Sequence, residues 1–403
     1  MIKKLIWYLA CVLLLTLPMG RVYANSDTIF LDAYADVKFG EVVDFNLSLD
    51  DPQLIQTLYL FIQPESGNLA YYEVPIGATD LTQYQLDPRS VPLRAFSDVV
   101  FWYQADLVTG EQVNSEEYRF TYLDNRFEWQ ALQTDHIRLY WYEGDLTFAT
   151  NAVNIAEQSY QTLQSRYGDL FAGSVIDVFV YSSTAALQDT LTQSAFDWVA
   201  GHADPELGQV LLSIAPGAEQ RIEMERQLPH ELTHLFLYRF SGGQVESQPA
   251  WLMEGLASNL EKTPNPDYQQ VLSKAVSEQR LIPVSTLCKA FPTGDEGVYL
   301  AYAESASFVA YLEETHGNEK LRTLLQEYAE GIGCEQGFLN VYGITLGQME
   351  GRWQQSALGI NRAAALLQKS APYLLLLAVL VIPALLAGWI NQRAYRQREL
   401  NAE

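Results

Sequence analysis

Cysteine, histidine and basic residues are all scarce in this chain of 403 residues. It contains 3 cysteines and 5 histidines, and its 25 lysines and arginines stand against 49 aspartates and glutamates. The net charge of −24 argues against nucleic acid as a partner, because phosphate binding needs clustered basic side chains. The hydrophobic share of 48% is ordinary for a globular protein, and the length leaves room for two folded domains.

The few cysteines argue against a cysteine-based metal centre, because neither Cys288 nor Cys334 has metal-ligand spacing. Cys11 lies in the predicted signal peptide, so these two are the remaining pair in an exported domain. An oxidising compartment would allow a disulfide between them, and two free buried thiols are the alternative.

The N-terminal residues 1–24 have the features of a signal peptide. Lys3 and Lys4 precede an apolar run over residues 5–17, and small residues end the segment at Ala24. The apolar run is too short to span a bilayer comfortably, so we predict cleavage. Retention as an uncleaved anchor is the alternative.

Residues 371–390 form an uncharged apolar stretch near the C-terminus. About twenty residues match a hydrocarbon core of roughly 30 Å, so we predict one transmembrane helix, with a buried soluble helix as the alternative. Three arginines follow, which favours a cytoplasmic tail over residues 391–403. We therefore expect a single-pass protein of the cell membrane, in contact with the lipid bilayer through this helix, with its folded bulk outside the cytoplasm.

Residues 25–125 have the pattern of an all-β domain. Five to seven strands over about a hundred residues are typical of an immunoglobulin- or fibronectin-like sandwich. The segment contains no histidine, so we interpret it as a spacer or recognition module. Apolar segments separated by turn residues predict strands at 41–49, 55–62, 71–74, 98–107 and 116–122.

The pattern changes after residue 125, and residues 126–355 are predicted to form an α+β domain. Because Pro229 lacks the N–H that a helix interior needs, we expect two helical segments to meet there. Periodicity predicts strands at 136–142 and 175–181, a hairpin from 198–203 and 209–214, and helices at 148–167, 302–315 and 319–330.

The residues that carry chemistry are His230, Glu231, His234 and Glu254. Residues four apart lie on the same face of a helix, so the two imidazoles can bind one ion. A catalytic zinc site also needs a third protein ligand and an open position for water. Glu254 offers that ligand, because a lone carboxylate in an apolar helix start is costly unless a metal neutralises it. An amphipathic core helix with two polar-face histidines is the alternative.

This pattern resembles the gluzincin zinc metallopeptidases, in particular the bacterial peptidase MA-like family. The resemblance implies a zincin-like fold with Zn²⁺ bound by His230, His234 and Glu254, and with Glu231 as general base. Thermolysin-like members carry an aspartate four residues after the glutamate ligand, whereas this chain has Ser258, so the partner of the first histidine stays open. The likeness spans residues 127–353 and rests on segments 228–234, 249–257, 302–312 and 346–353.

We therefore predict a zinc metallopeptidase of the gluzincin type that hydrolyses peptide or protein substrates. Glu231 would take the proton of the zinc-activated water. Tyr302 is the candidate donor to the oxyanion, chosen because it opens a predicted helix after the metal segments. Two alternatives stay open: a non-catalytic surface binding protein with a relic zincin fold, and a zinc hydrolase acting on non-peptide amides.

Overall fold

The computed structural model describes residues 29–77, 79–192, 201–360 and 362–400, so the predicted signal peptide lies outside the described residues. The chain forms two compact units. The first comprises Met1–Val153 and Val175–Gln220, and the second comprises Asn154–Ser174 and Arg221–Glu403.

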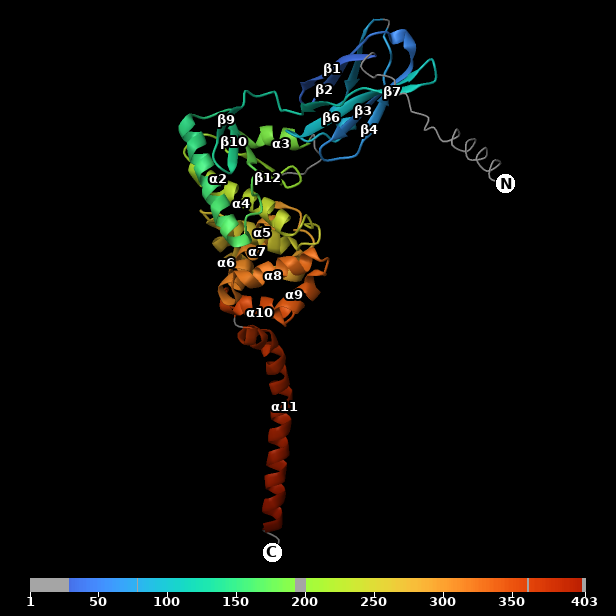
Figure 1. Ribbon diagram of the computed structural model, residues 1–403. Helices are drawn as coiled ribbons and strands as arrows, with labels where there is room; N and C mark the ends of the chain where they lie inside the picture. Colours follow the sequence, from blue (N-terminus) through green and yellow to red (C-terminus); the bar gives the residue numbers. More distant parts are fainter. Residues whose placement is uncertain (1–28, 78, 193–200, 361, 401–403) are drawn as a thin grey trace, which may run out of the picture. The chain divides into compact units, whose positions relative to one another are not determined.

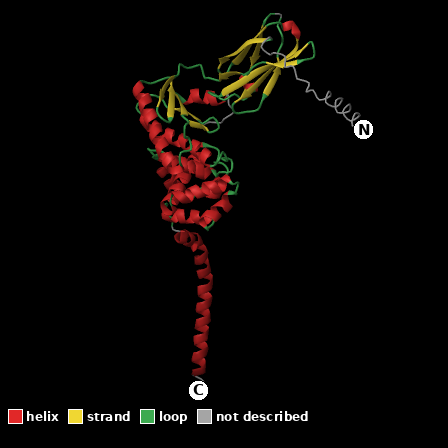
Figure 2. Cartoon of the chain, in the orientation of Figure 1, coloured by secondary structure: helices red, strands yellow, loops and turns green. Residues whose placement is uncertain are grey.

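The first unit begins with a β-sandwich (Figures 1 and 2). One sheet has the strand order β1-β2-β5, and the other has the order β4-β3-β6-β7 with β8 also paired to β6. All of these pairs are antiparallel. The strands are β1 Phe30–Lys38, β2 Val42–Leu49, β3 Ile55–Pro64, β4 Ala70–Glu73, β5 Leu81–Leu86, β6 Asp98–Leu107, β7 Gln112–Asn114 and β8 Tyr118–Thr121.

Alternation of buried and outward side chains explains why these residues form a sandwich. In β3, Leu58 and Leu60 are fully buried, and in β6, Phe101, Tyr103 and Ala105 are buried, while the alternate residues are partly exposed. The five segments predicted as strands are confirmed. The strands β1, β5 and β7 were not predicted. Burial does not explain the difference, because the predicted strands β4 and β8 contain no buried residue, whereas β5 and β7 do.

The rest of the first unit is built on a second, five-stranded sheet with the order β12-β13-β11-β10-β9. The three central strands are parallel, and both edges are antiparallel. The predicted strands and hairpin are confirmed, although residues 198–200 of the hairpin lie outside the described residues, and the short helix α3 was missed. The elements are β9 Gln130–Gln133, β10 Ile137–Trp141, β11 Ile176–Tyr181, α3 Thr184–Thr192, β12 Gly201–Asp204 and β13 Gln209–Ser213.

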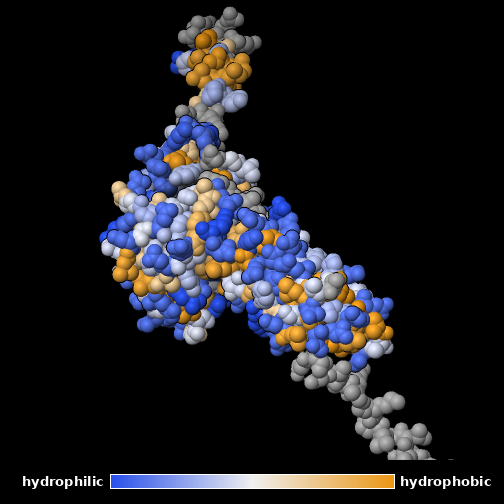
Figure 3. All heavy atoms as spheres, turned by 90° about the horizontal axis from the view of Figure 1, so that it is seen from above, coloured by the Kyte–Doolittle hydropathy of each residue, from blue (hydrophilic) through white to orange (hydrophobic). Residues whose placement is uncertain are grey.

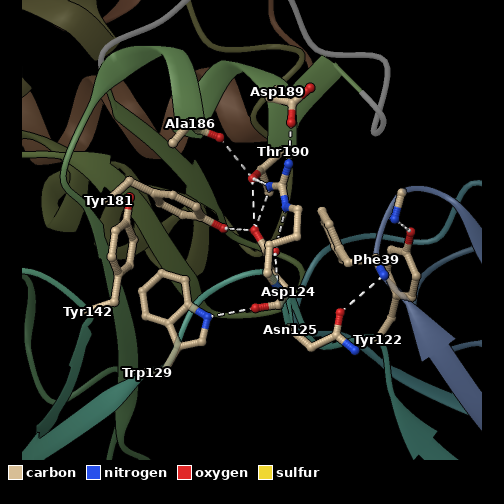
Figure 4. A network of polar contacts seen from close by, with 12 residues as sticks. Phe39, Tyr122, Asp124, Asn125, Trp129, Tyr142, Tyr181, Ala186, Asp189 and Thr190 are labelled. Carbon is tan, nitrogen blue, oxygen red and sulfur yellow. Dashed lines mark hydrogen bonds and ion pairs between the residues drawn. The ribbon is translucent and has the colours of Figure 1, made fainter.

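A buried carboxylate, Asp124, links the sandwich to the second sheet (Figure 4). Arg126 donates to it through Nε and Nη2, both at 2.7 Å. The Tyr181 and Thr190 hydroxyls donate at 3.0 and 3.1 Å, from β11 and α3. The Trp129 indole donates to the Asp124 backbone carbonyl at 2.8 Å. The segment that follows the sandwich is therefore fixed to the second sheet by hydrogen bonds that satisfy the buried charge.

The neighbouring residue, Asn125, bonds back to the sandwich. Its side chain donates to the Val37 carbonyl and accepts from the Phe39 N–H. The guanidinium of Arg126 also lies over the Phe39 ring, 4.9 Å from its centroid. The side chain of Asp124 therefore bonds to the second sheet and α3, whereas the side chain of the next residue, Asn125, bonds to the sandwich.

The second unit is helical. Cys288 and Cys334 are joined in a disulfide, which resolves the alternative that the sequence left open. The helices predicted at 148–167 and 319–330 are confirmed, and α6, α9 and α10 were not predicted. The helices are α2 Leu146–Tyr167, which begins in the first unit, α4 Gln220–Phe240, α5 Ala250–Leu260, α6 Asp267–Glu278, α7 Asp295–His316, α8 Asn318–Ala329, α9 Cys334–Tyr342, α10 Leu346–Ser356 and α11 Arg362–Leu400.

Two sequence-based expectations about these helices are wrong. Tyr302 does not open a helix, because α7 already begins at Asp295 and places Tyr302 in its interior. Gly297, a poor helix former, obscures that start in the sequence. Likewise, α4 runs unbroken through Pro229. A proline at that position cannot donate to the Glu225 carbonyl four residues earlier, but the Lys262 N–H donates to it at 2.9 Å, so the oxygen is satisfied and no break is required.

Helices α5 and α7 approach closely at Gly255, directly after Glu254. A Cβ on this residue would lie 2.5 Å from the Val309 side chain and 2.6 Å from the Ser305 carbonyl oxygen. Only glycine fits without displacement of the two helices. The glycine therefore places the helix that carries Glu254 against the helix that carries Tyr302.

Helix α11 contains the segment Ser370–Ile390, which is long and apolar enough to cross a membrane and is not buried by the rest of the described chain. This segment agrees in length and composition with the membrane-spanning helix predicted at 371–390. Over the folded units, by contrast, hydrophobic and hydrophilic residues are interspersed on the surface shown in Figure 3.

Glu304 is a fully buried acid on α7. Its Oε1 accepts the Ile282 N–H at 2.9 Å. Burial raises the pKa of Glu304 to about 8, and the charge of Glu350 adds to the rise, while the Ile282 bond opposes it. The folded state therefore holds this proton at neutral pH, where an unfolded chain has lost it.

We expect the stability of the protein to fall as the pH rises from about 4.5 to about 8, because the folded state binds the Glu304 proton throughout that window and the unfolded state does not. The free energy of unfolding should fall by up to a few kcal/mol across this pH range. Glu304→Gln should flatten this dependence in urea unfolding of the full chain in detergent. A variant whose midpoint falls as steeply with pH as that of the wild type would refute the assignment.

Candidate metal centre

Three potential metal ligands meet where α4 faces α5. His230 and His234 stand one turn apart on α4, with ring centroids 5.1 Å from each other, and Glu254 comes from the first turns of α5. Glu254 Oε2 lies 3.4 Å from His230 Nε2 and 3.8 Å from His234 Nε2. One ligand atom from each residue lies within 4.8 Å of the others.

This donor set fits a zinc ion. Ligand atoms that share a tetrahedral zinc at about 2.1 Å are separated by about 3.4 Å, so the three side chains already stand close to binding distance. They are 14%, 19% and 23% exposed for His230, His234 and Glu254, which leaves limited access for water. Glu254 Oε2 is buried without a well-formed hydrogen bond, as expected of an atom whose partner is a cation.

The charges around the histidines favour a cation as well. Burial by itself would lower the pKa of His230, but hydrogen bonds to Glu254 and Glu261 and the charge of Glu231 raise it to about 10. Burial would raise the pKa of Glu254, yet His234, His230 and Tyr302 together lower it. The Glu254 carboxylate therefore stays ionised, and in the metal-free protein it pairs with a positive charge whose place a divalent ion could take.

Glu261 supplies the partner of the first histidine that the sequence left open. Its Oε1 lies 3.0 Å from His230 Nδ1, and the Glu261 side chain is 4% exposed. Sequence reasoning sought this carboxylate four residues after Glu254, where Ser258 stands. Glu261 follows Glu254 by seven residues but lies just past the end of α5, so spacing along a helix does not point to it.

Glu231 and Tyr302 lie beside the same three ligands. Glu231 is buried and its charge acts on both His230 and Tyr302. The charge of Glu254 acts on the Tyr302 phenol, and the Tyr302 ring lies 6.4 Å from that of His230. Burial and the charge of Glu254 raise the pKa of Tyr302, which keeps its proton available for donation. The structure thus brings all five predicted residues together.

Comparisons with known proteins agree with this geometry. A family model described as the peptidase MA superfamily matches residues 156–359, which include all of the residues described above. No curated protein matches the chain.

Solved structures resemble the chain only weakly. Yeast LTA4 hydrolase in complex with bestatin is 12% identical, with a TM-score of 0.36, and the match covers 84% of this chain and 69% of that one. The bromine derivative of BhCBM56 is 10% identical over 23% of this chain and 92% of its own, with a TM-score of 0.19. BC0361, a polysaccharide deacetylase from Bacillus cereus, is 9% identical over 49% of this chain and 65% of its own, with a TM-score of 0.20.

These structural likenesses are too weak to bear on function, whereas the family match covers half of the chain and contains the metal-binding geometry. The chain belongs to the peptidase MA superfamily.

Proposed function

We propose that the protein is a membrane-anchored zinc metallopeptidase whose catalytic domain lies outside the cytoplasm. The observation that carries the proposal is the meeting of His230, His234 and Glu254 at ligand distances beside the buried Glu231. Membership of the peptidase MA superfamily supports peptide or protein substrates. The apolar segment Ser370–Ile390 supports the anchor, and the arginines after it support a cytoplasmic C-terminus.

In this proposal His230, His234 and Glu254 hold Zn²⁺ and leave one position open. A bound zinc supplies a Lewis acid and lowers the pKa of its water to about 7. Glu231 would accept a proton from the attacking water and deliver it to the leaving amine. Its burial beside His230 keeps its carboxylate close to the reacting water and poorly solvated.

Tyr302 is the proposed donor to the developing oxyanion. Its phenol keeps its proton because burial and the Glu254 charge raise its pKa. The Phe291 ring packs edge-on against the Tyr302 ring at 5.0 Å and restricts the positions that the phenol can take. In the metal-loaded enzyme, the Tyr302 phenol would donate to the substrate oxyanion.

Metal content tests the proposal first. We expect about one zinc per chain in the full-length protein purified in detergent, and loss of this zinc in His234→Ala, because two remaining ligands cannot hold the ion at neutral pH. His316→Ala is the matched control, since His316 ends α7 against Tyr342, away from the three ligands. A wild-type protein that takes up no zinc after reconstitution would instead favour a non-catalytic binding protein.

A further inference from the structure

Pro229 immediately precedes the first histidine and changes how α4 is bonded. In an uninterrupted helix, the N–H of residue 229 would donate to the carbonyl of Glu225. Proline has no such N–H, and the oxygen accepts the Lys262 N–H at 2.9 Å instead. The missing proline N–H therefore leaves a backbone carbonyl on α4 without its helical donor, and a residue that follows α5 donates to it.

Two side-chain bonds strengthen this junction. The Thr263 hydroxyl donates to Glu225 Oε2 at 2.7 Å, so Glu225 binds the segment after α5 through both its backbone and its side chain. The Lys262 ammonium donates to Gln158 Oε1 on α2 at 2.8 Å. Residues 261–263 are therefore held against α4 about one turn before His230.

The junction determines where the Glu261 carboxylate lies. Helix α5 ends at Leu260, and Glu261 has the non-helical backbone angles φ −57° and ψ 131°. The backbone direction at Glu261 is therefore not set by the geometry of α5. It is set by the hydrogen bond that the next residue, Lys262, makes to α4. The result is the 3.0 Å contact between Glu261 Oε1 and His230 Nδ1.

We propose that Pro229 and Glu261 act as a pair that positions His230 for the metal. The Glu225 carbonyl that Pro229 leaves without a helical donor holds the end of α5 in place. Glu261 then accepts from the Nδ1–H of His230, which leaves Nε2 as the ring nitrogen that faces the ion. A carboxylate in this place fixes the tautomer and orientation of a ligating imidazole. Glu261 is thus a positioning residue, and the inference rests on the proposed metal site.

Zinc affinity of the full-length protein in detergent, measured by competition with a chromogenic chelator, tests the pair. Glu261→Gln should weaken binding by 10- to 100-fold, the usual cost of losing such a partner. Pro229→Ala touches no ligand, yet it should weaken binding too, because the new N–H competes with Lys262 for the Glu225 carbonyl. The double variant should bind about as weakly as Glu261→Gln alone, since both changes remove the same contact.

Glu223→Gln is the matched control, because Glu223 is also half-buried on α4 but bonds to Arg226 and Gln227. Its zinc affinity should equal that of the wild type. Thermal unfolding of the metal-free forms separates positioning from a general loss of stability, which would lower the midpoint without changing affinity. Unchanged affinity in Pro229→Ala or Glu261→Gln, or additive losses in the double variant, would overturn the pair. A wild type without zinc would overturn the proposed function instead.

Discussion

Replacing Glu231 by glutamine should reduce peptide hydrolysis by about 10³- to 10⁴-fold while zinc stays bound. The amide has nearly the shape of the carboxylate but cannot accept a proton from water at neutral pH. Because His230, His234 and Glu254 form the proposed ligand set without Glu231, metal content should be preserved. The measurement is kcat/KM on a peptide mixture identified by library screening, alongside zinc content of the same preparation.

For this interpretation to hold, the substitution must lower the activity and leave the zinc content unchanged. Glu223→Gln, on the same helix and outside the ligand set, should retain both zinc and activity. Undiminished hydrolysis by Glu231→Gln would remove Glu231 from the mechanism. Joint loss of zinc and activity would assign it to the metal site and not to proton transfer.

Arg126→Met should destabilise the first unit by about 3–5 kcal/mol, because it leaves a buried carboxylate without its charged partner. Asp124 has no exposed side-chain surface, and Arg126 supplies two of the hydrogen bonds that satisfy it (Figure 4). The same guanidinium also bonds Asp189 and Thr190. Urea unfolding of the full chain, followed by tryptophan fluorescence, should show that the first unit unfolds at a lower urea concentration in the variant than in the wild type.

A matched arginine tests whether burial is the cause. Arg119 pairs with Glu117 at 3.7 Å, and both side chains are more than 60% exposed, so Arg119→Met should shift stability by less than about 0.5 kcal/mol. Adding Asp124→Asn to Arg126→Met should recover part of the loss, since no unpaired charge remains buried. Equal midpoints for Arg126→Met and Arg119→Met would contradict this account.

The parts of the site that the sequence revealed are those set by spacing along one element. His230 and His234 share a helix face because they are four residues apart, and Glu254 stands out as a charge in an apolar helix. Glu261 was missed because its position depends on how the end of α5 bonds to α4. That is a contact between elements, on which periodicity carries no information.

One error in the fold has the same physical origin. Pro229 predicts a break from local chemistry alone, but a backbone N–H from another segment removes the penalty. The missed strands are a different case, because β7 has only three residues, too few for a periodic pattern, whereas β3 and β6 have ten each.

The disulfide between Cys288 and Cys334 closes a covalent ring of chain that includes α7 and α8. Both Phe291 and Tyr302, which pack against each other, lie on that ring, as does Glu304. In the proposed location outside the cytoplasm, the protein would meet other peptidases that could cut its loops. A single cut within this ring would open it without releasing a fragment, so the helix that carries Tyr302 would remain tethered to the rest of the enzyme.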